Sequence, residues 1–384
     1  MYNLKQIETE KEEMRQAVLN ARAYKPIYVK IKVNYGCNLK CEMCKHWRET
    51  REPPISMDRF KETITELAEL GCKKIHFSGG EPLLRPQLPD LVEYASQLGM
   101  RVTLTTNGTL IDQKWCDFIK QHDLRIGVSI DGPDFLNDLY RKTRRGGGTH
   151  QRVMEGITLL QRNHIPFHVI TVLTHEALDY PDELYAFYVE NQIENVGFNV
   201  EEIEGPNERS SLSTADADQR FRRFMSRFFD LVATGEHPLR VREFDSMIAA
   251  ILHGNKDKLP PMQETTPFAI ISVDYEGNFS SFSPELLGLH SAQYGDFTLG
   301  NVQRDALDSV IHLPRFTALH TDIRAGIEKC RQECAYFGFC GGGAPVNKYF
   351  ENGSFVSTET LFCRLTRKAL LDVVLEKASQ ASGR

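Results

Sequence analysis

The stretch PIYVKIKVNYGCNLKCEMC, residues 26–44, joins a β-rich run to three closely spaced cysteines. Its second half sets Cys37, Cys41 and Cys44 at the spacing C-x3-C-x2-C, directly after the predicted strand. A closed structural zinc site needs four protein ligands, and no fourth cysteine or suitably placed histidine follows nearby. The loop therefore predicts a metal site with one coordination position open to a ligand from outside the chain.

The composition is that of a globular protein with a substantial core. The chain has 384 residues, of which 41% are hydrophobic and 26% charged, and its formal net charge is −6. This mild acidity argues against a nucleic-acid-binding surface. The N-terminus is charged and lacks an apolar signal segment, and no aliphatic run is long enough to cross a bilayer. We therefore expect a cytoplasmic protein with no nucleic-acid or membrane partner.

Nine cysteines occur, and seven of them fall into two clusters, one near each end of the chain. In a reducing compartment, clustered cysteines indicate metal binding rather than disulfides. The remaining two, Cys72 and Cys116, lie in apolar surroundings, so we expect them to be buried as small hydrophobic residues.

Between residues 26 and 205, β-rich runs alternate with amphipathic helical segments. The six runs span 26–33, 74–78, 101–106, 125–130, 167–173 and 195–201. One intervening helix is predicted over 56–71, with Ser56 as its N-cap. Six such repeats imply a parallel sheet with right-handed crossovers. The predicted fold class is α/β, a partial (β/α)6 TIM-type barrel with its chemistry at the carboxyl ends of the strands, and a flat doubly wound sheet is the alternative.

The rest of the chain divides into further segments that differ in their sequence pattern. We predict an N-terminal helix over 1–25, the barrel over 26–205 and a helical linker over 206–263. Residues 264–384 form a loop-rich, cysteine-bearing domain that ends in a helix. Within it, a β-hairpin is predicted to turn at Glu276-Gly277-Asn278.

The first cysteine cluster has a specific precedent. Three thiolates on one loop can hold three irons of a [4Fe–4S] cube and leave the fourth iron for a small chelating ligand. The spacing and placement resemble the radical S-adenosylmethionine (SAM) superfamily, with Met43 where that family usually has an aromatic residue. The resemblance implies that Cys37, Cys41 and Cys44 bind the cluster and that SAM chelates its fourth iron.

The segment Gly79-Gly80-Glu81-Pro82 follows the second predicted strand. Glycines there allow a close backbone approach to a ligand, and a carboxylate can accept from an amine. The segment resembles the GGEP motif of the same superfamily. That resemblance implies that Gly79, Gly80 and Glu81 hold the SAM amino group.

Three more positions resemble SAM contacts of the superfamily. Ser129 ends the fourth strand in SIDG and is implied to contact the ribose. Arg141 of a D-x2-R segment is implied to pair with the SAM carboxylate, for which a guanidinium is the suitable donor. Asn107 of TNG either contacts SAM or shapes a turn. The other arginines of RKTRRGGGTHQR (141–152) are interpreted as a solvated basic loop.

The second cluster contains four cysteines, which can close a site completely. They are Cys330, Cys334, Cys340 and Cys363. Zinc and [4Fe–4S] both accept four thiolates, so the spacing alone does not choose between them. The glycines at 341–343 would let backbone N–H groups approach cluster sulfides, which favours iron–sulfur.

This region resembles the SPASM extension of radical SAM peptide maturases, which typically carries two auxiliary clusters. Here Ala344 replaces one expected cysteine, and the 265–283 hairpin offers Ser280, Ser281 and Ser283 but no cysteine. The comparison implies two [4Fe–4S] clusters in all, one binding SAM and one auxiliary, the latter on the four C-terminal cysteines.

Two further stretches, VREFD (241–245) and FSPELLG (282–288), resemble the cyclophane-forming maturases of glycine-rich-repeat precursor peptides, the GrrM/OscB type. The implied reaction joins an aromatic ring to the Cβ of a nearby residue in a ribosomally made peptide. The implied partners are that precursor peptide and a reducing protein such as flavodoxin or ferredoxin. The alternatives are a radical SAM dehydrogenase acting on a Ser/Cys side chain or a sugar alcohol, and a non-catalytic zinc or electron-transfer protein.

Rearomatisation of the ring requires removal of one proton and one electron. The auxiliary cluster is the natural electron acceptor in this scheme. Candidates for the base that takes the proton are Asp131, Glu202, Glu243 and Asp245. The sequence does not choose among them.

Overall fold

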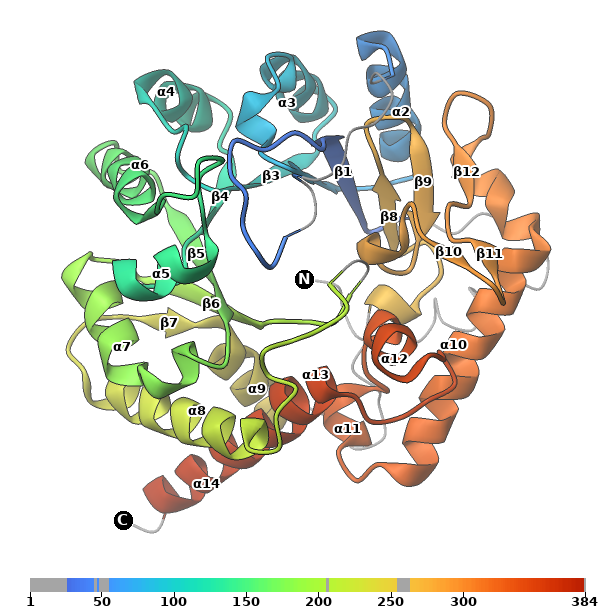
Figure 1. The fold of residues 1–384 in the computed structure, drawn as a ribbon. Coiled ribbons are helices and arrows are strands. Elements are labelled where there is room, and N and C mark those ends of the chain that lie inside the picture. Colours follow the sequence, from blue (N-terminus) through green and yellow to red (C-terminus); the bar gives the residue numbers. More distant parts are fainter. Residues whose placement is uncertain (1–25, 45–46, 48–54, 205–206, 254–262, 383–384) are drawn as a thin grey trace.

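The computed structural model describes residues 26–44, 47, 55–204, 207–253 and 263–382 (Figure 1). The helix predicted over 1–25 lies outside the described residues. Ten strands form one sheet in the order β12-β9-β8-β1-β2-β3-β4-β5-β6-β7. The sheet curves into a partial barrel with helices on its outside (Figure 1). This confirms the predicted α/β barrel.

The first six strands are parallel and follow the chain order. They are β1 (Tyr28–Asn34), β2 (Lys74–Gly79), β3 (Arg101–Thr106), β4 (Arg125–Ser129), β5 (Phe167–Leu173) and β6 (Asn195–Val200). Each overlaps a predicted run within two residues at either end. In β1, Val29, Ile31 and Val33 are fully buried. Burial of these alternate residues follows from the period of two along a strand.

Helices and short 3₁₀ turns connect these strands. They are α2 (Met57–Glu69), η2 (Pro82–Leu84), α3 (Leu88–Gln97), α4 (Gln113–Gln121), α5 (Asp134–Tyr140), α6 (His150–Arg162), η3 (Ala177–Asp179) and α7 (Pro181–Glu190). The predicted cap of α2 is confirmed, because the Ser56 side chain accepts from the Arg59 N–H. Cys72 and Cys116 are buried as predicted, with exposures of 1% and 0%.

The segment predicted as a helical linker contains a strand as well as helices. Helix α8 (Ala217–Thr234) and helix α9 (Arg242–His253) flank β7 (Arg240–Val241). The two residues of β7 pair in parallel with β6, and the Arg240 N–H donates to the Glu194 carbonyl at 2.7 Å. The prediction of a helical linker therefore misses this short strand, which lies between the two helices at the edge of the sheet.

Three strands of the C-terminal segment extend the barrel sheet, and two others form a separate two-stranded sheet. Strand β8 (Ile270–Val273) pairs in parallel with β1 and antiparallel with β9 (Asn278–Ser281), so the predicted hairpin is confirmed. Strand β12 (Gly300–Asn301) pairs antiparallel with β9 at the edge of the sheet. The smaller elements are η4 (Gln263–Thr265), η5 (Pro284–Leu286), β10 (His290–Ser291), β11 (Gly295–Asp296) and η6 (Leu307–His312). The predicted boundary at residue 264 therefore does not interrupt the sheet.

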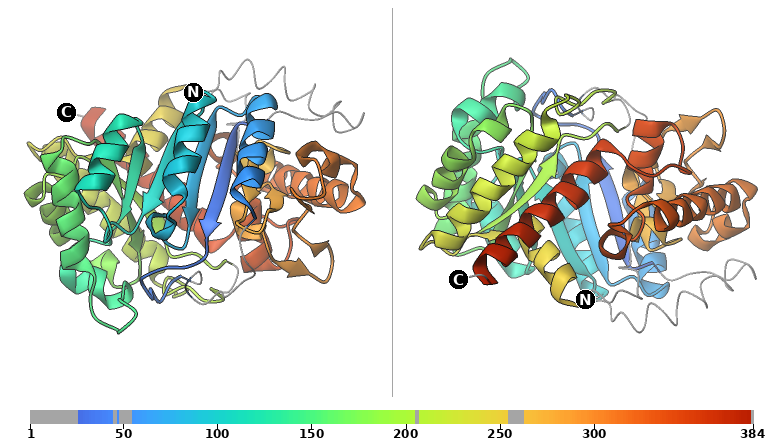
Figure 2. Two further views of the ribbon diagram at one scale, coloured as in Figure 1. Left: turned by 90° about the horizontal axis from the view of Figure 1, so that it is seen from above. Right: turned by 90° about the horizontal axis from the view of Figure 1, so that it is seen from below.

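Helices complete the C-terminal segment and return it to the barrel. They are α10 (Pro314–Glu333), α11 (Phe337–Cys340), α12 (Pro345–Asn352), α13 (Leu361–Cys363), the π-helical turn η7 (Arg364–Ala369) and α14 (Leu370–Ser382). Helix α14 packs along α8 and contacts α9 (Figure 2). In the part of the chain that the structure describes, no helix combines the length and the apolar character needed to cross a membrane.

Candidate functional site

The first cysteine cluster lies on the loop that leaves the carboxyl end of β1. This loop is bound to the segment that follows α5: the Lys40 N–H donates to the Lys142 carbonyl at 2.7 Å, and the Glu42 N–H donates to the Tyr140 carbonyl at 2.9 Å. Backbone bonds to a segment about 100 residues later therefore fix the path of the cysteine loop.

The GGEP segment packs directly against the same loop. The Gly80 N–H donates to the Asn34 carbonyl at 3.0 Å, and the Glu81 N–H donates to the Gly36 carbonyl at 2.8 Å. A Cβ at Gly80 would lie 2.1 Å from the Gly36 oxygen, and Gly79 has φ +128°. Only glycine fits both positions. The two glycines thus set the cysteine loop in place, and their contact with SAM stays a prediction.

The Glu81 side chain is fully buried and bound within the protein. Its carboxylate accepts from the Leu83 N–H (3.1 Å), the Thr106 hydroxyl (2.7 Å) and the Asn107 N–H (2.8 Å). Burial raises the pKa of Glu81 to about 7, and the three donors oppose that rise. This carboxylate therefore joins the ends of β2 and β3. Its predicted contact with the SAM amine stays a prediction.

Asn107 links the end of β3 to the cysteine loop. Its amide Nδ2 lies 2.9 Å from Asn38 Oδ1 and 3.8 Å from Cys37 Sγ. Its Oδ1 accepts from the Thr109 N–H at 3.0 Å, which is the turn-shaping bond predicted as one of its two roles. Asn38 and Thr109, which are hydrogen-bonded to each other at 2.8 Å, are not predicted site residues. Asn38 lies within the C-x3-C-x2-C motif and Thr109 directly follows the TNG motif.

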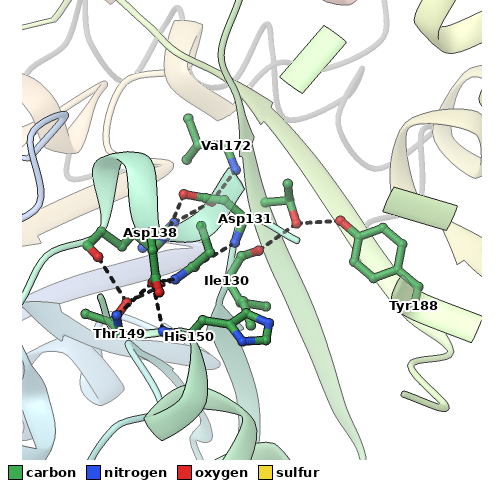
Figure 3. A network of polar contacts seen from close by, with 10 residues as sticks. Ile130, Asp131, Asp138, Thr149, His150, Val172 and Tyr188 are labelled. Atoms are coloured by element: carbon green, nitrogen blue, oxygen red, sulfur yellow. Dashed lines mark hydrogen bonds and ion pairs between the residues drawn. The ribbon is translucent and has the colours of Figure 1, made fainter. Parts of the chain in front are cut away.

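Arg141 and Asp131 form a buried bidentate ion pair. The Arg141 Nε and Nη2 atoms lie 2.7 and 2.8 Å from the two carboxylate oxygens of Asp131. Asp131 also accepts from the Val172 N–H at 2.9 Å (Figure 3). The cysteine loop is hydrogen-bonded to Tyr140 and Lys142, on either side of Arg141. Burial raises the pKa of the Cys41 thiol, and the charge of Arg141 opposes that rise. The predicted role of Arg141 toward the SAM carboxylate stays a prediction.

Asp138, three residues before Arg141, orders the start of α6. Its carboxylate accepts from the Thr149 N–H at 2.7 Å and the His150 N–H at 2.9 Å (Figure 3). A carboxylate at a helix N-terminus satisfies N–H groups that lack partners within the helix. Asp138 therefore holds the C-terminal end of the 142–148 loop at the start of α6.

The 142–148 loop is largely exposed, as interpreted from the sequence, but Arg144 also makes a specific contact with the cysteine loop. Its Nε and Nη2 atoms donate to the Cys37 carbonyl at 3.0 and 2.8 Å, and its guanidinium lies 6.0 Å from the Trp47 ring centroid. The bonding partner is 107 residues away in sequence. No local pattern could have identified it.

The three thiols of the N-terminal site lie within electrostatic reach of one another. The pKa of Cys37 is raised to about 11, chiefly by burial and further by Glu81, Cys41 and Cys44, while the Leu39 N–H opposes the rise. Among the described residues no three His, Cys, Asp or Glu side chains are gathered tightly enough for a single metal ion. Three thiols on one loop can serve as ligands to three irons of a [4Fe–4S] cluster.

The four C-terminal cysteines also come together, on α10, α11, α13 and the turns between them. The Cys334 N–H donates to the Cys330 carbonyl at 2.9 Å. Burial raises the pKa of Cys363 to about 12, with a further rise from Cys340. Burial also raises the pKa of Cys340, which Arg367 and the N–H groups of Gly342 and Gly343 oppose. A thiol set with backbone donors aimed at sulfur fits a cluster ligand set.

The β8–β9 hairpin is built from serine–backbone bonds and aromatic packing. The Ser281 hydroxyl accepts from the Phe268 N–H at 2.9 Å, and the Ser280 hydroxyl donates to the Phe297 carbonyl at 2.9 Å. The Phe282 ring stacks on Phe316 at a centroid distance of 5.5 Å. The two serines therefore serve the fold of the hairpin.

A group of four carboxylates, here called the mouth carboxylates, lies where the barrel meets the C-terminal segment. Its members are Glu202, Glu204, Glu264 and Glu285. Glu202 follows β6 and accepts from Asn347 Nδ2 of α12 at 2.7 Å. Burial and the other three carboxylates raise the pKa of Glu202 to about 8, against the bond from Asn347. Burial and Glu285 raise the pKa of Glu264 to about 7.

Only Glu202 of this group is a predicted site residue. Glu285 lies in the FSPELLG stretch, whose resemblance assigns no role to its carboxylate. Glu264 carries no sequence signal at all.

The remaining predicted residues lie apart from this group. Glu243 Oε2 accepts from the Phe198 N–H at 2.8 Å. Asp245 pairs with Arg240 at 2.8 Å on the surface. Ser129 is half-buried at the end of β4.

Comparison with known proteins gives a consistent picture. The profile of the radical SAM superfamily matches residues 31–188. An uncharacterized protein of Synechocystis is 41% identical over 362 residues, which cover 90% of each chain. The serine-type anaerobic sulfatase-maturating enzyme of Bacteroides thetaiotaomicron is 25% identical over 356 residues, covering 85% of this chain and 84% of the enzyme.

Among solved structures, native anSMEcpe with bound AdoMet and the Cp18Cys peptide shares the fold. Its TM-score is 0.75 at 20% identity, and the match covers 93% of this chain and 99% of that chain. The shared fold thus includes the C-terminal segment as well as the barrel.

Proposed function

This chain belongs to the radical SAM superfamily, and we propose that it forms a C–C crosslink, a cyclophane, in a ribosomally made precursor peptide. The bond would join an aromatic ring to the Cβ of a nearby residue. The observation that carries the proposal is the distribution of thiols: three at the carboxyl end of β1, four in the C-terminal segment and none in the β8–β9 hairpin. The resemblance of VREFD and FSPELLG to cyclophane-forming maturases supports the specific product.

The cofactors fit the side chains present. Cys37, Cys41 and Cys44 would hold a SAM-binding [4Fe–4S] cluster, and the C-terminal cysteines an auxiliary one. Once bound, these groups supply a 5′-deoxyadenosyl radical and methionine, by reductive cleavage of SAM, and an electron acceptor. The substrate would lose one hydrogen atom from Cβ, then one proton and one electron from the ring. A flavodoxin or ferredoxin would supply the reducing electron.

The chain's own residues would orient SAM and shield it from water. Gly79 and Gly80 present their backbone at the carboxyl end of β2, beside the cysteine loop. Arg141 keeps donor capacity beyond its two bonds to Asp131, because a guanidinium carries five N–H groups. Ser129 and Asn107 lie at the ends of β4 and β3. These positions support the predicted SAM contacts.

Glu202 is the base that the geometry favours. Asp131 is bound by Arg141 and Val172, Glu243 accepts a backbone N–H, and Asp245 pairs on the surface. Glu202 has one amide donor and stands at the barrel mouth among other carboxylates. A base with a pKa near 8 is well matched to accepting a proton near neutral pH.

A second candidate is the oxidation of a serine or cysteine side chain. The likeness to a serine-type sulfatase-maturating enzyme favours it. Both reactions remove two hydrogens from a peptide, so mass change alone does not separate them.

Co-expression with a glycine-rich-repeat precursor peptide, followed by tandem mass spectrometry, tests the proposal. A loss of two hydrogens that blocks fragmentation between an aromatic residue and its neighbour supports the crosslink. The same loss confined to one serine or cysteine supports oxidation instead. An unmodified peptide, when the purified enzyme still cleaves SAM, contradicts both for that substrate. The Cys41→Ala variant is the matched negative control.

A further inference from the structure

Lys348 of α12 is a buried lysine in contact with a cysteine of the auxiliary site. The residue is only 3% exposed. Its Nζ atom donates to the Cys330 sulfur at 3.2 Å and to the Gly326 carbonyl at 2.9 Å. The ammonium is therefore held at the sulfur from a helix that carries no cysteine itself.

No carboxylate among the described residues forms an ion pair with Lys348. By contrast, Lys377, another lysine of the C-terminal segment, pairs with Asp230 at 2.6 Å. A charge buried without a counter-ion is strongly unfavourable. The anionic group that Lys348 contacts is the thiolate that Cys330 becomes on binding metal.

The backbone around Lys348 is shaped to admit it. A Cβ at Gly326 would lie 3.3 Å from Lys348 Nζ and 2.0 Å from the Phe355 carbonyl oxygen. Glycine at this position lets α10 approach both the ammonium and the segment at Phe355. The contact is thus built from three separate parts of the C-terminal segment.

We propose that Lys348 is a positioning residue that hydrogen-bonds the Cys330 ligand and raises the reduction potential of the auxiliary cluster. A positive charge in a water-poor site stabilises the reduced cluster, which carries one more negative charge than the oxidised form. Lys348 thereby makes the site a better acceptor for the electron released on rearomatisation. This role rests on the proposed function, in which the four C-terminal cysteines bind a [4Fe–4S] cluster.

The test is a potentiometric titration of the anaerobically reconstituted enzyme, followed by electron paramagnetic resonance. Lys348→Met removes the charge and the donor, whereas Lys348→Gln removes only the charge. Both should shift the auxiliary midpoint potential to more negative values, with the larger shift in the methionine variant. The SAM-binding cluster of the same samples and the variant Lys377→Met should show unchanged potentials.

The outcomes separate this role from the proposed function. An auxiliary potential equal to wild type in either neutral variant overturns the role of Lys348. If both neutral variants lose the auxiliary irons and Lys348→Arg retains them, the site requires a positive charge at this position. Loss of the irons in all three variants overturns that requirement. A wild-type enzyme with zinc or without the second set of irons contradicts the auxiliary cluster itself.

Discussion

The two cysteine sites differ in how the chain holds them. The N-terminal site has three thiols on one loop, and distant parts of the barrel hold that loop through Gly80, Asn107 and Arg144. The C-terminal site has four thiols on helices and turns of one segment, with backbone N–H groups of its own glycines at Cys340. The N-terminal site therefore depends on contacts with distant parts of the barrel, whereas the C-terminal site is assembled largely from residues of one segment.

This difference suits two different tasks. A site that leaves one metal position open needs the surrounding barrel to orient an external ligand. A site with four thiolates needs only to hold its cluster and set its potential. Variants of each site should therefore fail in different ways.

The largest effect is expected for Cys41→Ala. Removing one of three thiolates leaves the SAM-binding cluster without a stable ligand set, so both SAM cleavage and peptide modification should fall below detection. Chromatography of 5′-deoxyadenosine and mass spectrometry of the peptide measure the two. Cys72→Ala, which removes a buried cysteine outside both sites, should keep both activities. If Cys41→Ala still cleaved SAM, the N-terminal thiols would not be needed for the SAM-binding cluster, and the comparison between the two cysteine sites would fail.

Cys340→Ala should separate the two sites. Loss of the auxiliary ligand removes the electron acceptor but leaves the N-terminal loop intact. SAM cleavage should persist while crosslinked product disappears, and bound iron should fall by about half from the two-cluster value. Iron analysis, SAM-cleavage assays and peptide mass spectrometry on one preparation measure these three quantities. Normal product formation in this variant would show that the auxiliary site is not needed.

A smaller effect is expected for Gly80→Ala, which tests how the barrel holds the cysteine loop. The added Cβ would lie 2.1 Å from the Gly36 oxygen, so the backbone must shift. We expect a loss of about 1–3 kcal/mol in the free energy of unfolding and weaker SAM binding. Chemical denaturation and equilibrium dialysis measure these.

Gly36→Ala is the matched control for that variant. Gly36 lies on the same loop and is exposed, and a Cβ added to it would have no atom within 4 Å. Its free energy of unfolding should change by about 0.5 kcal/mol or less. An equal loss in both variants would mean that the effect comes from backbone flexibility and not from the packing against Gly80.

The smallest effect on stability is expected at Glu202, whose bond to Asn347 joins the barrel to the cysteine-bearing segment. Its pKa of about 8 exceeds the ordinary value of 4.5, so the folded protein binds more protons than the unfolded chain between these values. The stability that this group contributes therefore falls as pH rises through that window. The free energy of unfolding of Glu202→Gln should exceed that of the wild type by on the order of 1 kcal/mol at pH 8.5, and the two should be equal at pH 4.

Activity should respond to pH in the opposite direction. The base works in its ionised form, so crosslinking by the wild type should rise as pH increases through about 8. Glu202→Gln should lose both this rise and most of the product, while the surface variant Glu190→Gln keeps the wild-type profile. A preserved pH profile in Glu202→Gln would point to another base.

The sequence alone determined the six parallel strands, the β8–β9 hairpin, the barrel class and the two groups of thiols. Strand positions follow from local periodicity, and cysteine spacing on one loop constrains which thiols can share a metal. The Ser56 cap and the burial of Cys72 and Cys116 follow equally from neighbouring residues. These features depend on residues within a few positions of one another.

Only the tertiary structure decided which side chains surround those thiols. Arg144 donates to the Cys37 carbonyl, and Lys348 donates to the Cys330 sulfur. The charges of Glu264 and Glu285 raise the pKa of Glu202. No local pattern encodes these partners. Asp131 and Arg141, which the sequence offered for separate roles, became partners because the end of β4 faces the end of α5. The physical reason is that periodicity fixes the direction of a side chain, whereas its partner depends on how the whole sheet curves and closes.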